Sequence, residues 1–166
     1  LALHGDIYKK DGSVVHVNIG EDENDPIFYI SDLLPHLAKD QNARTLKDGI
    51  KGEEMNVWVG TLKFRDDKVS EKVKLNVLNI LFEKYGIIEP DFFSAELTLV
   101  PAAKARDIGL DRSLIGAYGH DDRVCAYTSM MAELDYTNET PDWTSIVVFA
   151  DKEEVGSDGV AGLHSD

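Results

Sequence analysis

A short apolar run, Ile146–Phe149, gives way abruptly to a charged cluster, Asp151–Glu154, and then to Gly156. An unbroken run of β-branched and aromatic residues is typical of a strand that is covered on both faces in an α/β sheet. In open α/β sheets, ligands bind beyond the carboxyl ends of the strands. The adjacent carboxylates Glu153 and Glu154 therefore stand where a functional site is expected. The alternative is a solvated turn whose acidic residues only keep the protein soluble.

The charge and cysteine content narrow the class of protein. The formal net charge is -14 with a pI near 4.6, which disfavours binding to nucleic acid or to anionic membranes. Peptides, cations and metal ions remain compatible partners. The single cysteine, Cys125, excludes an internal disulfide framework and fits a reducing cytoplasm. The sequence contains no apolar run long enough to cross a bilayer and no signal segment.

The first hundred residues have the pattern of a β-rich domain. Leu1–Leu3 and Ser13–Gly20 read as strands joined by a turn at Lys10–Ser13, where Asp-Gly is a strong hairpin signal. The spacing of apolar residues predicts a helix over Val69–Tyr85, which Gly86 ends. Further strands are expected at 27–30, 55–60 and 94–101, a brief helix at 33–39, and a mobile loop at 40–54.

A second helix is expected to begin at Asp121–Arg123. Asp121 and Asp122 are in the right place to cap its N-terminus. Cys125 falls on the apolar stripe of this helix and is interpreted as a small core residue. Because the helix directly precedes the Ile146–Phe149 run, Asp121 and the Glu153–Glu154 pair are expected to meet at one sheet edge. Carboxylates in contact raise one another's pKa, and a divalent cation removes this cost, as in co-catalytic hydrolytic sites.

Three segments carry a resemblance to a known family: Ala105–Asp111, Gly119–Arg123 and Asp151–Ser157. Together they resemble the aminopeptidase I / aspartyl aminopeptidase family of dizinc exopeptidases. Leu1–His4 and Asp25–Leu37 also look like that family, so the similarity extends in order over nearly the whole chain. The Glu-Glu-Val-Gly-Ser motif is quite specific to that family.

The resemblance implies a role for four residues. Asp121 matches a ligand that bridges two zinc ions, and Glu154 matches a ligand to one of them. Glu153 matches the general base that takes a proton from the metal-activated water. His4 matches a histidine that reaches the active site of a neighbouring subunit and helps to hold the substrate. For His4 the alternative is a half-buried strand histidine that is hydrogen-bonded to the backbone.

The resemblance also implies an architecture of the α/β class. Residues 1–103 match an inserted β-rich dimerisation domain, and residues 104–166 match part of an αβα catalytic sandwich. The parent protein would be a cytoplasmic, zinc-dependent aminopeptidase with two zinc ions per complete active site and peptide substrates. It would form homo-oligomers, dimers assembled into a dodecamer. No partner role for nucleic acid or membrane is expected.

The remaining metal ligands of the family are not found in the sequence, and both ends look like cuts through a larger protein. We therefore expect a fragment that is inactive alone. Two other functions compete with the peptidase: a non-catalytic oligomerisation module of the same parent protein, and a calcium site at Glu21–Asp25, whose spacing departs from that of a calcium loop. The preferred N-terminal residue of the substrate and the native metal stay open.

Overall fold

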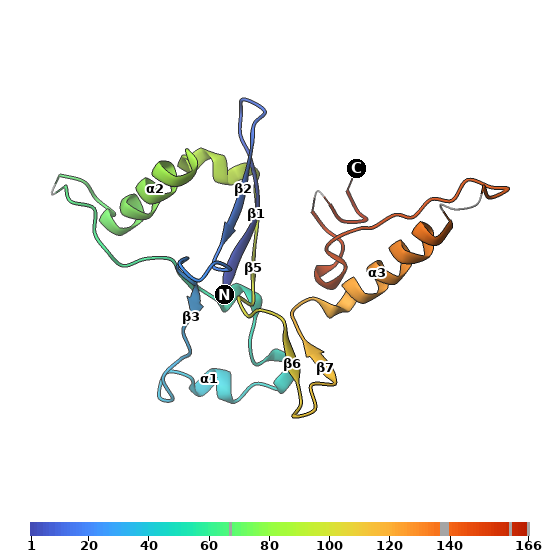
Figure 1. Ribbon diagram of the computed structural model, residues 1–166. Coiled ribbons are helices and arrows are strands. Elements are labelled where there is room, and N and C mark those ends of the chain that lie inside the picture. The colour runs from blue at the N-terminus through green and yellow to red at the C-terminus, as the bar shows by residue number, and fades with distance from the viewer. Residues whose placement is uncertain (67, 137–139, 160, 166) are drawn as a thin grey trace. The chain divides into compact units, whose positions relative to one another are not determined.

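A computed structural model describes residues 1–66, 68–136, 140–159 and 161–165. The chain is a mixed α/β protein with small open sheets, and it divides into two compact units, Leu1–Ala103 and Lys104–Asp166 (Figure 1). We call these the N-terminal unit and the C-terminal unit. In the part of the chain that the structure describes, no helix has the length and apolar character needed to cross a membrane.

The N-terminal unit is built on a three-stranded antiparallel sheet in the order β2-β1-β5. Its strands are β1 (Ala2–Tyr8), β2 (Val14–Ile19) and β5 (Ala95–Val100). The predicted hairpin is confirmed. Asp11 Oδ1 accepts a hydrogen bond from the Ser13 amide at 3.0 Å, and Gly12 takes the positive φ of 84° that the turn requires.

The two faces of this sheet differ in character. Ile7, Val17 and Ile19 point to one face and form the core with Ile87, and both Ile7 and Ile87 are only 1% exposed. Residues directly opposite one another on antiparallel strands share a face. On the other face most side chains are polar, although the buried Ala2 and Val100 also lie there. These polar residues are His4, Asp6, His16, Asn18, Glu96 and Thr98.

The middle strand of the sheet lies unusually close to its neighbour at Gly5. A Cβ atom built on Gly5 would lie 1.9 Å from the backbone oxygen of Glu96, and the φ of Gly5 is +143°. Only glycine combines this backbone conformation with such a close approach.

Around the sheet, short elements fill the segments that the sequence marked as strands and loops. β3 (Tyr29–Ile30) pairs with β4 (Val57–Trp58), as two predicted strands that are shorter than expected. The helix predicted over 33–39 is wrong: residues 35–37 form turns, because Pro35 lacks an amide hydrogen and disfavours a helical residue before it. The segment expected as a loop instead holds α1 (Lys39–Asn42), η1 (Leu46–Asp48) and η2 (Gly52–Glu54).

The main helix of the N-terminal unit, α2, runs over Lys72–Tyr85. It begins three residues later than predicted, after Glu71 in a left-handed conformation, and it ends at Gly86 as predicted, with the Gly86 amide donating to Phe82 O at 2.8 Å. After it, η3 (Glu89–Ser94) is closed by Asp91, whose Oδ2 accepts a hydrogen bond from the Ile88 amide at 2.9 Å.

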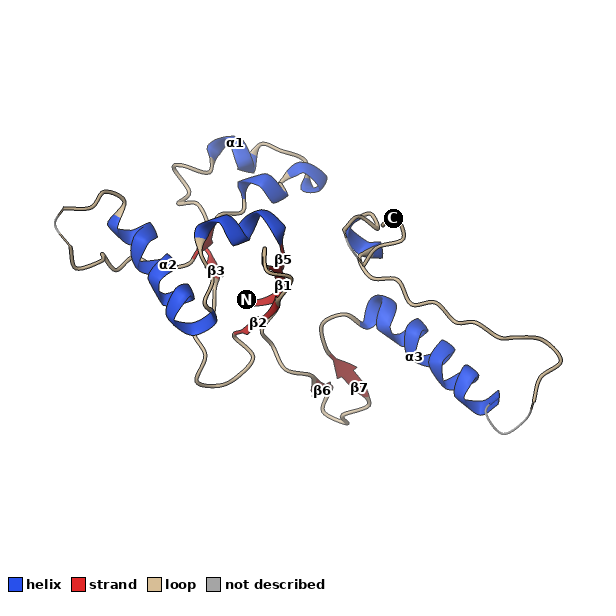
Figure 2. Cartoon of the chain, turned by 90° about the horizontal axis from the view of Figure 1, so that it is seen from above, coloured by secondary structure: helices blue, strands red, loops and turns tan. Residues whose placement is uncertain are grey.

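The C-terminal unit begins with a hairpin of β6 (Arg106–Ile108) and β7 (Leu114–Gly116), followed by α3 (His120–Asp135) and η5 (Glu153–Val155) (Figure 2). The helix was predicted, but its cap was not: the N-cap residue is Gly119, and no side chain caps the helix. Cys125 is exposed, which corrects its interpretation as a core residue. No described residue of α3 is buried.

The strand predicted over Ile146–Phe149 is wrong in this structure. The segment is extended coil, and Ile146 and Val148 are 79% and 75% exposed. A segment becomes a strand only where a neighbouring strand supplies hydrogen bonds to its backbone. Each strand among the described residues pairs with another strand and not with Ile146–Phe149. One contact fixes the start of the segment: Ser145 Oγ donates to Glu133 Oε2 on α3 at 2.6 Å.

Candidate active site

The Glu153–Glu154 pair lies in a closed loop of the C-terminal unit. Lys152 and Gly156, with φ of 70° and 98°, stand at the two ends of η5. The Ser157 amide donates to Lys152 O at 2.7 Å, and the Asp151 amide donates to Ala161 O at 3.0 Å. These bonds turn the chain back on itself, so that both glutamates stand at one exposed corner.

Asp121 lies at the start of α3 but does not share the helical conformation. Its φ and ψ are -88° and 116°, and its peptide bond to Asp122 is cis. The preceding residue, His120, reaches back to β7, where its Nε2 lies 3.0 Å from Ile115 O.

The two acidic segments meet in space. The pKa of Glu154 is raised above its ordinary value, first by the negative charge of Asp121 and next by that of Glu153. Burial, a hydrogen bond with Glu153 and the charge of Asp122 add to the effect in the same direction. An interaction of this kind weakens with distance, so Asp121 lies near Glu154, although the sheet edge at which the acids were expected to meet is not formed.

The donor set at this corner consists of carboxylates, the oxygen ligands that divalent cations accept, and a cation removes the repulsion that raises the pKa of Glu154. Across the described ranges, however, no group of three or more His, Cys, Asp or Glu residues is arranged to hold a metal ion. A zinc site normally has four ligands, or three and a water. The residues present therefore fit a contribution to a metal site and not a whole one.

His4 lies in β1 of the N-terminal unit, between Asn18 and Thr98 of the neighbouring strands. Its side chain is 35% exposed, while its Nε2 atom is shielded from solvent and has no hydrogen-bond partner. Glu21 Oε1 lies 3.2 Å from Nε2, within ion-pair distance, but in a geometry that does not make a hydrogen bond. Among the described residues, His4 Nε2 does not make the backbone hydrogen bond that was considered as the alternative.

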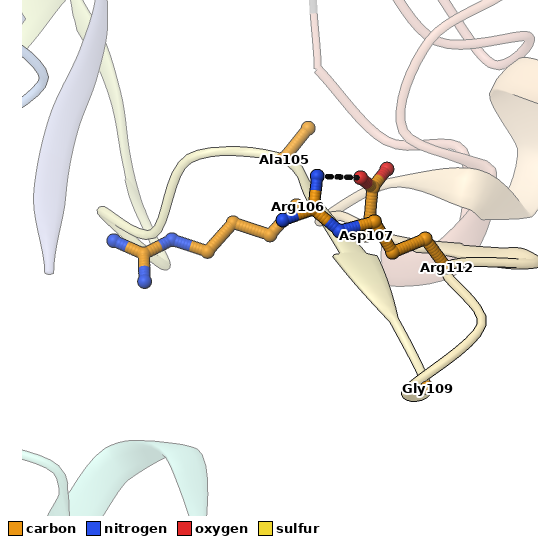
Figure 3. A pocket seen from close by; sticks show the side chains of 5 residues that line it. All are labelled: Ala105, Arg106, Asp107, Gly109 and Arg112. Atoms are coloured by element: carbon orange, nitrogen blue, oxygen red, sulfur yellow. Dashed lines mark ion pairs between the residues drawn. The ribbon is translucent and has the colours of Figure 1, made fainter.

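A hollow of about 540 Å³ lies on the β6–β7 hairpin. The sequence did not predict this hairpin. In Figure 3, Arg112 and Asp107 point toward one another, 3.6 Å apart, while Arg106 extends away from them. The signal for this hairpin was present at Asp111-Arg112-Ser113. Asp111 Oδ1 accepts a hydrogen bond from Ser113 Oγ at 3.0 Å, the same contact that Asp11 makes with Ser13 in the first hairpin. The hollow is lined by Ala105, Arg106, Asp107, Gly109 and Arg112.

In the Glu21–Asp25 loop, the carboxylates of two aspartates already make contacts with other groups of the protein. Asp22 Oδ1 accepts a hydrogen bond from the Asn24 amide at 2.9 Å, and Asp25 Oδ2 accepts one from the Gly20 amide at 3.1 Å. Asp25 also lies 3.8 Å from the Lys84 ammonium group. These contacts favour a solvated loop over a calcium site.

Carboxylates grouped at one corner of an α/β protein are typical of metal-dependent hydrolases. The sequence profile of the family described as "Aminopeptidase I zinc metalloprotease (M18)" matches residues 1–166. The chain belongs to this family of aminopeptidases. The predicted family resemblance is thereby confirmed.

Relatives and solved structures agree with this assignment. The chain is 51% identical over 165 residues to a probable M18 family aminopeptidase 1 of Clostridium acetobutylicum, covering 99% of this chain and 35% of the relative. It is 47% identical over 162 residues to the protein of the same description from Thermotoga maritima, covering 98% and 35%. The chain thus spans about a third of the length of these relatives.

Two crystal structures share the fold. The M18 aminopeptidase from Thermotoga maritima superposes with a TM-score of 0.80 at 46% identity, over 99% of this chain and 35% of that one. Aminopeptidase I from Clostridium acetobutylicum gives a TM-score of 0.80 at 50% identity, over 97% and 35%.

Proposed function

We propose that this chain is part of a zinc-dependent aminopeptidase that hydrolyses the N-terminal peptide bond of peptides with an activated water. The observation that carries the proposal is the grouping of Asp121 with Glu153 and Glu154 in a member of the M18 family. Acidic side chains that repel one another and have shifted pKa values are typical of sites that bind a cation or carry out a reaction.

Each acid has a role in this proposal. Asp121 would be the ligand shared by two zinc ions, and Glu154 would bind one of them. Glu153 adjoins Glu154 and would take a proton from the attacking water as a general base, a role that requires it to come within hydrogen-bond reach of that water. Zinc, when bound, polarises the scissile carbonyl group and acidifies water. The remaining ligands would come from the portion of the relatives that this chain does not cover, so the chain alone would be inactive.

The N-terminal unit, residues 1–103, would serve as the dimerisation domain, and residues 104–166 as part of the αβα catalytic sandwich. His4 supports a role in substrate binding, because its side chain is 35% exposed and, among the described residues, its Nε2 makes no hydrogen bond, although Glu21 Oε1 lies 3.2 Å away. In a homo-oligomer, as dimer or dodecamer, the His4 side chain would help to hold a peptide bound by a neighbouring subunit. A cytoplasmic location is part of the same proposal.

The decisive variant is Glu153→Gln in the full-length protein. Glutamine keeps the size and the hydrogen-bonding capacity of the side chain but cannot accept the proton, so turnover should fall about 10²–10⁴-fold while zinc stays bound. Release of the N-terminal residue from a peptide panel and elemental analysis measure the two effects. Glu53→Gln, at an exposed position of the N-terminal unit, is the control. Normal turnover by the Glu153 variant would remove it from the mechanism.

The second candidate is a non-catalytic oligomerisation module. It is favoured by one observation, the lack of a complete set of metal ligands in the described chain. Sedimentation separates the two functions, since a strictly monomeric chain that binds zinc would count against an association role.

A further inference from the structure

We propose that His120 is a positioning residue that holds Asp121 at the metal site by anchoring the start of α3 to strand β7. This inference rests on the proposed role of Asp121 as a zinc ligand. His120 is not itself assigned as a ligand. Its part is to fix the backbone from which the Asp121 carboxylate projects.

The start of α3 does not fix that direction by itself. Asp121 has non-helical φ and ψ, and Gly119 before it has a left-handed φ of 79°. No side chain caps the helix, so the capping hydrogen bond that normally sets the entry of a helix is missing. The residues around Asp121 therefore need another constraint.

His120 supplies this constraint through a long-range contact. Its Nε2 lies 3.0 Å from the carbonyl oxygen of Ile115 in β7. A carbonyl oxygen only accepts hydrogen bonds, so Nε2 carries the hydrogen and donates it. The bond ties the residue next to Asp121 to a paired strand, because Ile115 is opposite Asp107 in the β6–β7 hairpin.

A second contact holds the same turn from its other side. The Arg123 guanidinium group lies over the Tyr118 ring, 5.7 Å from its centroid. It also fills the space beside Gly119, where a Cβ atom would lie 3.1 Å from it. The turn is thus held on both sides of Asp121, by His120 and by Arg123.

The functional consequence follows from the charges at the corner. Before a cation arrives, Asp121, Glu153 and Glu154 repel one another, and an unrestrained Asp121 would turn away. A ligand that is held in place before binding loses less freedom when the metal binds. Partners that orient metal ligands typically change metal affinity by about 10–100-fold when they are removed.

The experiment compares two substitutions in the full-length protein. His120→Leu removes the donor and retains bulk, whereas His120→Gln keeps an N–H donor on a side chain of similar reach. Zinc affinity is measured by competition with a chromophoric chelator, and kcat is measured at limiting and at saturating zinc. We expect His120→Leu to weaken zinc binding about 10–100-fold, with kcat largely recovered at saturating zinc. His120→Gln should restore most of the affinity.

The control is His36→Leu, the same change at an exposed histidine of the N-terminal unit, which should bind zinc like the wild type. Thermal unfolding of the metal-free proteins checks that each variant folds. If His120→Leu does not fold, His120→Asn replaces it, because its shorter amide cannot span to Ile115 O, and the same loss is expected.

The outcomes distinguish failure of the positioning role of His120 from failure of the aminopeptidase proposal. Wild-type zinc affinity in both the leucine and the asparagine variants overturns the positioning role of His120 and leaves the aminopeptidase proposal standing. Loss of affinity in the glutamine variant equal to that in the leucine variant also overturns it. A wild-type protein that binds no zinc and releases no N-terminal residue overturns both.

Discussion

The Asp121 carboxylate raises the pKa of Glu154 more than any other group does, although one residue lies at the start of α3 and the other in η5. In the metal-free chain, Asp121→Asn should therefore lower the pKa of Glu154 toward its ordinary value. Asp122→Asn should have a smaller effect, since Asp122 contributes least among the causes. Titration of the Glu154 side-chain carboxyl by NMR measures both. Equal effects of the two variants would contradict this order.

The same relationship predicts a dependence of stability on pH. The folded pKa of Glu154 lies above that of the unfolded chain, so the folded protein binds this proton more tightly. The stabilisation by protonated Glu154 is present at low pH and is lost as the pH rises through the folded pKa. Asp121→Asn should flatten this part of the profile of unfolding free energy against pH, measured without metal.

Gly5→Ala should destabilise the N-terminal unit by about 3 kcal/mol or more, because backbone strain adds to a clash with Glu96 O. Gly12→Ala is the matched control: Gly12 also has a positive φ, but a Cβ there meets nothing within 4 Å. It should cost about 1 kcal/mol, from the left-handed conformation alone. Denaturant unfolding of the two variants measures the difference. Similar losses of unfolding free energy would contradict the close approach at Gly5.

Ile87→Ala should lower the free energy of unfolding by about 2–5 kcal/mol, since it leaves a cavity against Ile7 and Val17 in the only core cluster identified within the described ranges. Ile80→Ala removes the same atoms from a side chain of α2 that is 53% exposed. Its effect should stay within about 0.5 kcal/mol. Chemical denaturation of the full chain compares the two, and equal losses would mean that Ile80 is covered in solution.

The Arg44–Glu54 pair should stabilise the α1–η2 segment in a pH- and salt-dependent manner. Arg44 donates to both carboxylate oxygens of Glu54, at 2.6 and 2.9 Å, and it lowers the pKa of Glu54. A lowered folded pKa means that the stabilisation is present above the ordinary pKa and disappears as the pH falls through the folded value. The pair is exposed, so the effect should be small and should vanish at high salt.

Amide hydrogen exchange of Asp48 and Met55, which close turns in this segment, provides the measurement. Glu54→Gln should speed exchange at neutral pH, and Glu53→Gln should leave it unchanged. Faster exchange in both variants would show that negative charge in general, and not the pairing with Arg44, protects the segment.

The sequence predicted the elements whose signals are local. Asp11-Gly12 specifies the first hairpin through contacts within the turn, and Gly86 ends α2 because its conformation suits glycine. The proximity of Asp121 to Glu154 was also expected and is present. The roles of these residues as zinc ligands, of Glu153 as the base and of His4 in substrate binding stay predictions.

The errors occur where structure depends on distant partners. Ile146–Phe149 has strand-forming residues but no pairing strand among the described residues, so the segment does not form a strand. The alternation in β6 and β7 was too short to recognise, although Asp111 and Ser113 repeat the turn chemistry of the first hairpin. The anchoring of His120 to Ile115 depends on both β7 and α3, and no spacing in the sequence announces it.

The open apolar segment over Ile146–Phe149 has a practical consequence for work at the bench. Among the described residues no strand pairs with this segment, and unpaired backbone beside exposed Ile, Val and Phe side chains promotes association between copies of a chain. A recombinant protein of these 166 residues will therefore scatter light and precipitate as its concentration rises, unless a fused soluble carrier or a charge introduced within the run keeps the copies apart.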